Sequence, residues 1–327
     1  PINVFIPANT SYTEDMTPYF GIMMTPSNDA VNNTGLHIIS DANITAYYEL
    51  DTYYNPDIIA LKGANGLGTE FYVPLQNEWT NGNYTPDLPY TPFDIVATED
   101  NTVVSIYPKT DLDFGHPALQ SFTIFLDRGQ TYSGSVGVAD LSIPASENPV
   151  GTVILSNHNI AVSVKDDSVN PTGFGGRDIM TDQIIPTDIL GMEYIAQKGF
   201  LSFDDNVYVL ATQNNTQVFM DGVLQTILFA GELFIYDLSQ DVVYVNTSKP
   251  AYVYQATGFG CEVGMAILPP LTCAGSTEVS FVRSSTERFG LNILTRVGNK
   301  GNLQLNGDPR FLTAADVQLV PGNTNLM

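Results

Sequence analysis

Short apolar or alternating segments recur along the whole chain, and each is bounded by Asn, Asp, Gly or Pro. They are rich in β-branched and aromatic residues, as in FDIVAT (93–98), TVVSIYP (102–108), VYVLAT (207–212) and AYVYQA (251–256). Helical periodicity is almost absent. Because such segments recur about every 8 to 15 residues, the pattern predicts an all-β protein.

Four short patterns return in the same order, which indicates an internal repeat. A polar turn followed by an apolar strand occurs at 40–46, 156–162 and 247–253, and a Leu-Gly-x-Glu type pattern occurs at 67–71, 190–194 and, more loosely, 275–279. A turn of the type Ala-Thr-x-x-Asn-Thr occupies 97–102 and 211–216, and a Gly-Gln or Gly-Glu hairpin occupies 126–132 and 228–234. The repeats predict one domain over residues 1–327, with internal units at about 35–150, 151–240 and 241–310.

Within each repeat the predicted strands fall into two groups of four. Four-stranded sheets of about fifty residues, repeated five or six times, are typical of a β-propeller. The sequence therefore predicts a six-bladed β-propeller-like fold. The last group is incomplete, so circular closure would draw on residues 19–24. Tandem β-sandwiches are the alternative, because the same strands also satisfy that architecture.

The chain is strongly acidic, with 35 Asp and Glu residues against 12 Lys and Arg residues and a formal net charge of -23. Nucleic-acid binding depends on basic residues that neutralise phosphates, so this composition excludes it. An anionic membrane surface would repel the chain for the same reason. No apolar run approaches the roughly 18 residues of a membrane span. We expect a secreted or cell-surface chain without direct membrane insertion, and a fragment of a longer exported protein.

Cys261 and Cys273 are the two cysteines, and they flank the pair Pro269-Pro270. No His lies nearby to complete a metal site. A disulfide that closes this short loop is the preferred interpretation, and it would place the chain in an oxidising compartment. Two buried free thiols are the alternative.

The repeated residues resemble the IgGFc-binding protein N-terminal domain family, which occurs in animal mucus proteins and in large secreted surface proteins of bacteria. The matching segments are GLHIISDANITAYY, LGTEFYVP, FDIVATEDNTVVSIYP and GCEVGMAILPPLTCAGSTEVSFVRS, and the last carries both cysteines. The similarity covers about residues 20–310. Asn43 and Asn159 stand where the family pattern prefers proline. The resemblance implies a non-catalytic extracellular module of a bacterial surface protein, without catalytic residues to transfer and without a ligand that the family name settles.

No motif for nucleophilic catalysis or phosphate binding is present, so no catalytic residue is predicted. A propeller glycoside hydrolase or lyase is the enzyme alternative, because so acidic a chain can contain paired carboxylates. Acidic loops also suggest calcium, which selects oxygen ligands. The metal candidates are Asp111, Asp113, Asp166, Asp167, Asp204 and Asp205. Their spacing matches neither an EF-hand loop nor a nonapeptide calcium repeat, so solvated acidic loops are the simpler interpretation.

The loop at 77–86 combines Trp, Tyr and amide side chains and joins the two strand groups of the first repeat. Aromatic faces stack on sugars or anchor partner proteins, and long polar loops often carry function. The predicted ligand-binding residues are Trp79, Asn81, Asn83 and Tyr84. A Trp79 that only covers a core edge is the alternative. Together these features predict an adhesion or recognition module that binds a glycan or a surface protein, with a structural filament subunit as a further alternative.

Overall fold

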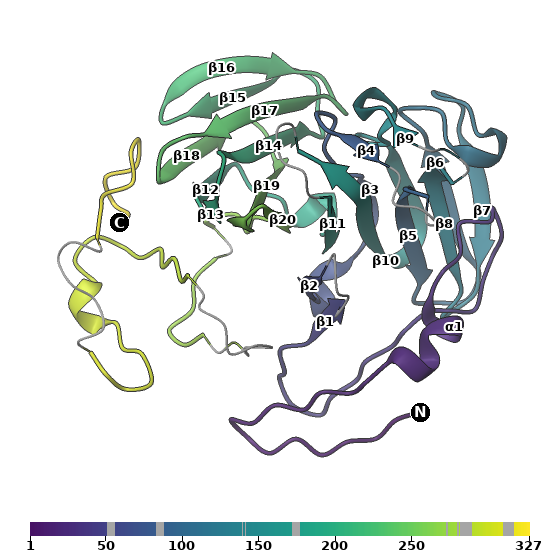
Figure 1. Cartoon of the computed structure of the whole chain (residues 1–327), viewed down its shortest axis with the longest axis horizontal. Coiled ribbons are helices and arrows are strands. Elements are labelled where there is room, and N and C mark those ends of the chain that lie inside the picture. Colours follow the sequence, from purple (N-terminus) through teal and green to yellow (C-terminus); the bar gives the residue numbers. More distant parts are fainter. Residues whose placement is uncertain are drawn as a thin grey trace.

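The structure is a computed structural model that describes residues 1–50, 56–82, 88–138, 140, 142–171, 177–272, 274–279, 281, 290–309 and 317–327. Its regular structure is almost entirely β, as the sequence predicts (Figure 1). Helical structure is confined to α1 (Phe20–Met23) and to short 3-10 turns at Thr17–Tyr19, Gly63–Gly66, Asp113–Gly115, Ala145–Glu147, Thr187–Ile189 and Lys300–Asn302. No helix in the described part of the chain is long and apolar enough to cross a membrane.

Two strand sets form the body of the protein. The first strand set contains β3 (Leu67–Tyr72), β4 (Thr80–Gly82), β5 (Thr91–Ala97), β6 (Thr102–Tyr107), β7 (Phe122–Leu126), β8 (Thr131–Val136), β9 (Ser142–Ile143), β10 (Val153–Asn170) and β11 (Asp178–Gln183). The second strand set contains β12 (Glu193–Gln197), β13 (Phe200–Leu201), β14 (Asp205–Ala211), β15 (Thr216–Met220), β16 (Val223–Leu228), β17 (Leu233–Leu238), β18 (Val242–Thr247), β19 (Ala251–Gly260) and β20 (Glu262–Ile267). A hairpin of β1 (Tyr47–Leu50) and β2 (Asp57–Ala60) contacts the first set through β11.

The two strand sets repeat one pairing scheme. In the second set, β18 pairs with β12 and β15, and β15 pairs with β16. In the same set, β19 pairs with β14 and β20, and β14 pairs with β17. In the first set the single strand β10 takes the places of both β18 and β19. Its beginning pairs with β3 and β6 and its later part pairs with β5 and β11, while β7 and β8 extend β6 and β5.

The first strand set has one long strand, β10, where the second has β18 and β19, and the two sets also differ at one residue of the repeated turn at 156–162 and 247–253. Pro250 precedes β19, and because proline has no backbone N–H to donate to a ladder, the second set is interrupted there. Asn159 holds the equivalent position in β10, which continues from Val153 to Asn170. The substitution therefore keeps the turn in place but leaves the strand continuous.

A buried apolar cluster lies between the two sheets of the second strand set. Val218 and Val245 reach it from the sheet of β15 and β18, and Val209 and Val253 reach it from the sheet of β14 and β19. Two sheets that pack face to face through alternate side chains form a β-sandwich.

The sheet of β14 and β19 is buried on both faces. Because side chains alternate along a strand, Val209 and Val253 face the second set, whereas Tyr208, Tyr252 and Tyr254 belong to the core of the first set. Tyr208 and Tyr254 stack with ring centroids 5.1 Å apart. One sheet of the second set therefore also serves as a layer of the first.

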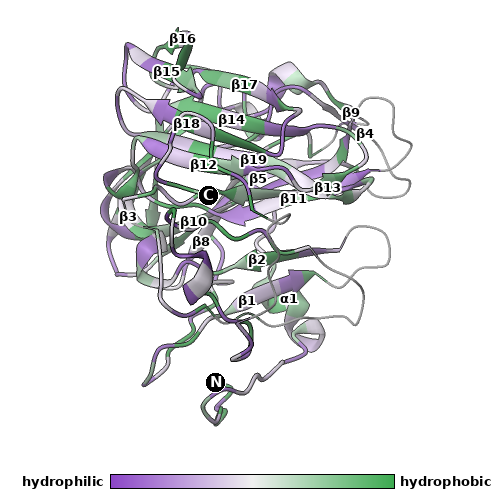
Figure 2. Cartoon of the chain, turned by 90° about the vertical axis from the view of Figure 1, so that its left-hand side faces the viewer, coloured by the Kyte–Doolittle hydropathy of each residue, from purple (hydrophilic) through white to green (hydrophobic). Residues whose placement is uncertain are grey.

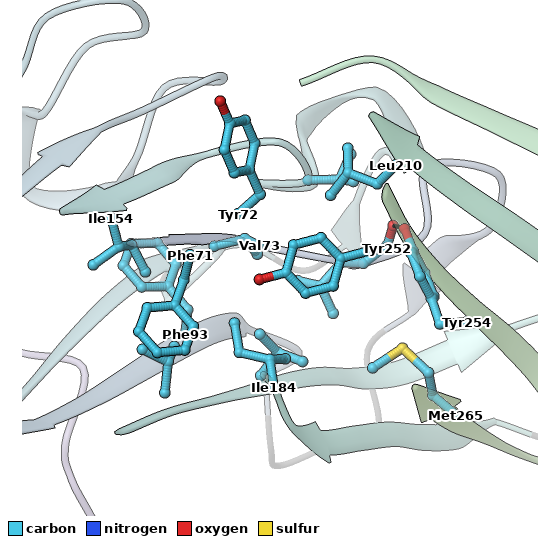
Figure 3. Packing of buried hydrophobic residues seen from close by; sticks show 14 of the residues in the cluster. Phe71, Tyr72, Val73, Phe93, Ile154, Ile184, Leu210, Tyr252, Tyr254 and Met265 are labelled. Atoms are coloured by element: carbon cyan, nitrogen blue, oxygen red, sulfur yellow. Dashed lines mark hydrogen bonds between the residues drawn. The ribbon is translucent and has the colours of Figure 1, made fainter. Parts of the chain in front are cut away.

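Tyrosine hydroxyls add polar links across this shared core. Tyr252 donates a hydrogen bond to the carbonyl of Ile185, and Tyr254 donates one to the carbonyl of Leu75 at 2.7 Å. Figure 3 shows the Tyr252 ring beside Val73 and the Tyr254 ring beside Met265, all members of the same buried cluster. The shared core joins the two strand sets into one body.

The predicted six-bladed propeller is not shown. Within the described residues the sheets have two, nine, four and five strands, and none is closed. In a propeller blade consecutive strands pair with each other. Here the turn at 211–216 connects β14 and β15, but these strands lie in different sheets. The equivalent turn at 97–102 connects β5 and β6, which pair with β8 and β7 rather than with each other.

The predicted circular closure is also not observed. Residues Phe20–Met23 form α1 rather than a closing strand. The apolar segments at 36–40, 291–296 and 302–307 form no strand either. The third repeat lacks the third and fourth sequence patterns, and the described residues after β20 form no strand from which to build a facing sheet.

Candidate functional site

Segments of both strand sets meet at one end of the molecule, which we call the loop end. It consists of residues 76–82, 177–178, 198–206 and 258–263. In Figure 2 the neighbouring strands β4, β9, β11 and β13 lie on the right-hand side. The side-chain amide of Asn206, in the second strand set, donates a hydrogen bond to the Glu78 carboxylate, which precedes β4 of the first. Within the first set, Thr80 of β4 pairs with Asn170 at the end of β10. Within the second set, the backbone N–H of Ser202 donates to the carbonyl of Gly260 at 2.7 Å.

A buried polar network fixes residues 76–82. The Asp166 carboxylate is fully buried, and its four side-chain donors are Gln76 Nε2 at 2.8 Å, Asn81 Nδ2 at 2.5 Å, Thr91 Oγ1 at 2.9 Å and Asn148 Nδ2 at 3.2 Å. Burial raises the pKa of Asp166, and these four hydrogen bonds act in the opposite direction. Asp166 is thus the acceptor that joins segments distant in sequence.

Two of the predicted ligand-binding residues belong to this network rather than to the surface. Trp79 is 6% exposed and Asn81 is 0% exposed. The Trp79 ring packs edge-on against Phe203, with centroids 6.4 Å apart. Neither side chain offers a free face to a sugar or a partner, so Trp79 has the packing role that was the alternative. Asn83 and Tyr84 lie outside the described residues, and ligand binding by that part of the loop stays a prediction.

The six predicted metal-binding carboxylates each have protein partners. Asp111 accepts a hydrogen bond from the backbone N–H of Ala118 at 2.7 Å. Asp113 accepts hydrogen bonds from Ser135 Oγ at 3.0 Å and from the backbone N–H groups of Gly137 and Val138 at 3.2 Å each. Asp205 accepts hydrogen bonds from the backbone N–H of Gly199 at 2.8 Å and from Gln255 Nε2 at 2.6 Å. Asp167 pairs with Lys165 at 3.5 Å and Asp204 with Lys198 at 2.5 Å. The structure brings Asp166 together with Asn81, but no group of three or more His, Cys, Asp or Glu in the described ranges is placed to hold a metal ion.

Carboxylates of β11 cover the outer edge of β20. Asp178 Oδ2 accepts from the backbone N–H of Val263 at 3.1 Å, and Asp182 Oδ2 accepts from that of Ile267 at 2.9 Å. Lys62 pairs with Asp182 at 2.8 Å. Because β20 pairs with β19 on its other side, these bonds satisfy edge groups that would otherwise be unpaired and tie the two strand sets together.

Asp57, Asp178 and Glu262 form an acidic group at this junction. Burial raises the pKa of Asp57 to about 6. Burial also raises the pKa of Asp178 to about 7, with contributions from the negative charge of Glu262 and from a hydrogen bond between the two carboxyl groups. The three carboxyl groups come from β2, β11 and β20.

An exposed row of side chains crosses three strands at the loop end. Phe200 of β13 is the register partner of Phe259 of β19, and Phe259 is the register partner of Glu262 of β20. Register partners on neighbouring strands point to the same face, so we call these three residues the aromatic row. The two rings are 50% and 66% exposed, and their centroids lie 6.5 Å apart. A Cβ atom at Gly290 would lie 1.8 Å from the Phe200 ring, so the ring rests against this glycine.

A family model described as IgGFc binding protein matches residues 58–326. The chain belongs to the IgGFc-binding protein family. This family consists of binding modules rather than enzymes, and it is typically extracellular. The searches of curated proteins and of solved structures found no match.

Sequence reasoning missed the aromatic row in this IgGFc-binding family member, although a local signal was present. Gly260, at φ 65°, and Cys261 form the two-residue turn between β19 and β20, and glycine at such a position is a hairpin signature. That signature places Phe259 opposite Glu262. The structure does not support the predicted disulfide, since Cys261 is free and exposed. Cys273 lies outside the described residues.

Proposed function

We propose that this chain is a non-catalytic, extracellular adhesion or recognition module that binds a protein ligand through its loop end. The exposed aromatic row carries the proposal. Large aromatic side chains that stand exposed next to each other are typical anchors of protein interfaces. The register of three paired strands holds the row in place, so little ordering is needed when a partner binds.

The family membership supports a binding function and leaves the ligand open. Burial of Trp79 removes the exposed indole on which the glycan prediction rested. A protein ligand is therefore favoured over a glycan.

The test compares wild type with the double variant Phe200→Ser, Phe259→Ser. The family name points to the Fc part of immunoglobulin G as the first protein probe, and a glycan array provides the competing ligand class. Phe125→Ser is the matched control, because Phe125 is 69% exposed but lies on β7 of the first strand set. We expect a protein probe whose binding to wild type falls at least about tenfold in the double variant and is unchanged in the control. Binding of glycans alone, or equal binding by all three proteins, would refute the proposal.

A further inference from the structure

We propose that the aromatic row recognises a cationic side chain, Arg or Lys, presented by the protein partner. This inference rests on the function proposed above and names the chemistry of the group that the row receives. The row places two exposed aromatic faces and one exposed carboxylate side by side on three neighbouring strands.

The geometry suits a cation because each part of the row attracts positive charge. The face of an aromatic ring carries negative electrostatic potential and attracts an ammonium or guanidinium group within about 6 Å. The rings of Phe200 and Phe259 have their centroids 6.5 Å apart and are tilted by 45° to each other, so a long side chain laid across the row can contact both. The Glu262 carboxylate at the end of the row provides the counter-charge. A guanidinium can stack on a ring and hydrogen-bond a carboxylate in the same plane, so Arg satisfies both demands best.

The surroundings of the row add to this preference. The negative charges of Glu262 and Asp57 both act on Asp178, which shows that several carboxylates crowd this corner. Lys198, two residues before Phe200, is already paired with Asp204 at 2.5 Å. The whole chain carries a formal charge of -23, so long-range attraction also favours a basic partner.

The other occupants fit the row less well. An apolar side chain would bury Glu262 beside it without a compensating charge, which is costly. A bare metal ion finds no group of three or more suitable ligands in the part of the chain that the structure describes.

The experiment measures fluorescence anisotropy of a labelled tetra-arginine peptide, with a tetra-glutamine peptide as the neutral probe, at physiological salt. Phe259→Leu keeps an apolar side chain and the net charge but removes the aromatic face. Glu262→Gln removes the carboxylate. Each variant has a matched control on the first strand set, away from the loop end. Phe125→Leu on β7 is the control for the ring. Glu99→Gln is the control for the charge, because Glu99 is exposed in the turn at 97–102 between β5 and β6.

We expect wild type to bind tetra-arginine and not tetra-glutamine. Phe259→Leu and Glu262→Gln should each weaken binding by about fivefold, as the loss of one exposed cation–aromatic or ionic contact implies. The two controls should bind within a factor of about two of wild type. Since all four positions are exposed, the variants should fold normally, which circular dichroism checks.

Two results would overturn the inference. If wild type does not bind the tetra-arginine peptide, the inference that the row recognises a cationic side chain is refuted. Row variants that bind as tightly as their controls would show that general acidity, rather than the row, attracts the peptide. In either case the proposed function would still stand if a protein ligand binds wild type and not the Phe200→Ser, Phe259→Ser variant. Failure of the cation inference and failure of the proposed function are therefore distinguishable.

Discussion

Replacing Asp166 by Ala tests the buried network that holds the loop end. The change removes the acceptor for Gln76, Asn81, Thr91 and Asn148. Each buried donor left without a partner costs about 1–3 kcal/mol. The sum is reduced because the variant no longer buries a carboxylate and because water can enter the space. We therefore expect the free energy of unfolding to fall by about 3–5 kcal/mol, which is less than the full cost of four unpaired donors.

The neighbouring residue supplies the control. The Asp167 side chain is 24% exposed and pairs with Lys165 at 3.5 Å, so Asp167→Ala should cost less than about 1 kcal/mol. Urea unfolding followed by tryptophan fluorescence measures both variants, and Trp79 is the only tryptophan, so it reports on this network directly. Acrylamide should quench Trp79 more strongly in Asp166→Ala than in wild type. Equal stability of the two variants would refute the view that Asp166 organises the loop end.

Three further predictions concern charge, the thiol and calcium. Burial raises the pKa of Asp178 from its ordinary value of 3.8 to about 7 in the folded protein, so its contribution to stability is complete below about pH 4 and is lost as the pH rises through 7. Urea titrations at pH 5 and pH 8 should show wild type losing stability relative to Asp178→Asn, and parallel behaviour would contradict this. Cys261 is exposed and free, so a maleimide should label it in the native protein, whereas an unlabelled Cys261 would indicate the disulfide with Cys273. Each candidate metal carboxylate already has protein partners, so the melting temperature should be the same in calcium and in chelator, and a rise of several degrees with calcium would restore the calcium hypothesis.

The sequence predicted the strands far better than their arrangement. The turns at 97–102 and 211–216 do connect strands, as their pattern indicates. A turn of this kind has the same residues whether its strands pair within one sheet or cross to the facing sheet. Alternating apolar positions are likewise common to a propeller blade and a sandwich, so the number and spacing of strands favoured a closure that the structure does not show.

The roles of the loop residues depend on contacts between distant segments. Trp79 stands in a polar loop, but it belongs to a buried cluster of residues distant in sequence and packs against Phe203, while Gln76 beside it is hydrogen-bonded to Asp166. Asp166 itself has the local sequence of an exposed acidic turn. Its four donors lie between 18 and 90 residues away, so no local pattern could have identified the network.

The aromatic row combines a local and a distant element. The hairpin that joins Phe259 to Glu262 is visible in the sequence, but the pairing of β13 with β19 is parallel and links residues far apart in the chain. The row could therefore be predicted only in part. The exposure of both rings follows from the fold, because β13 has two residues and ends the sheet at this corner.

Site-specific photo-cross-linking tests the claim that the loop end is the binding surface most directly. A benzophenone amino acid replaces Phe259 in one protein and Phe125 in another, and each is irradiated with labelled tetra-arginine peptide. The proposed site predicts a cross-linked product at position 259 and none above background at position 125. Equal yields at both positions, or no product at position 259, would contradict it.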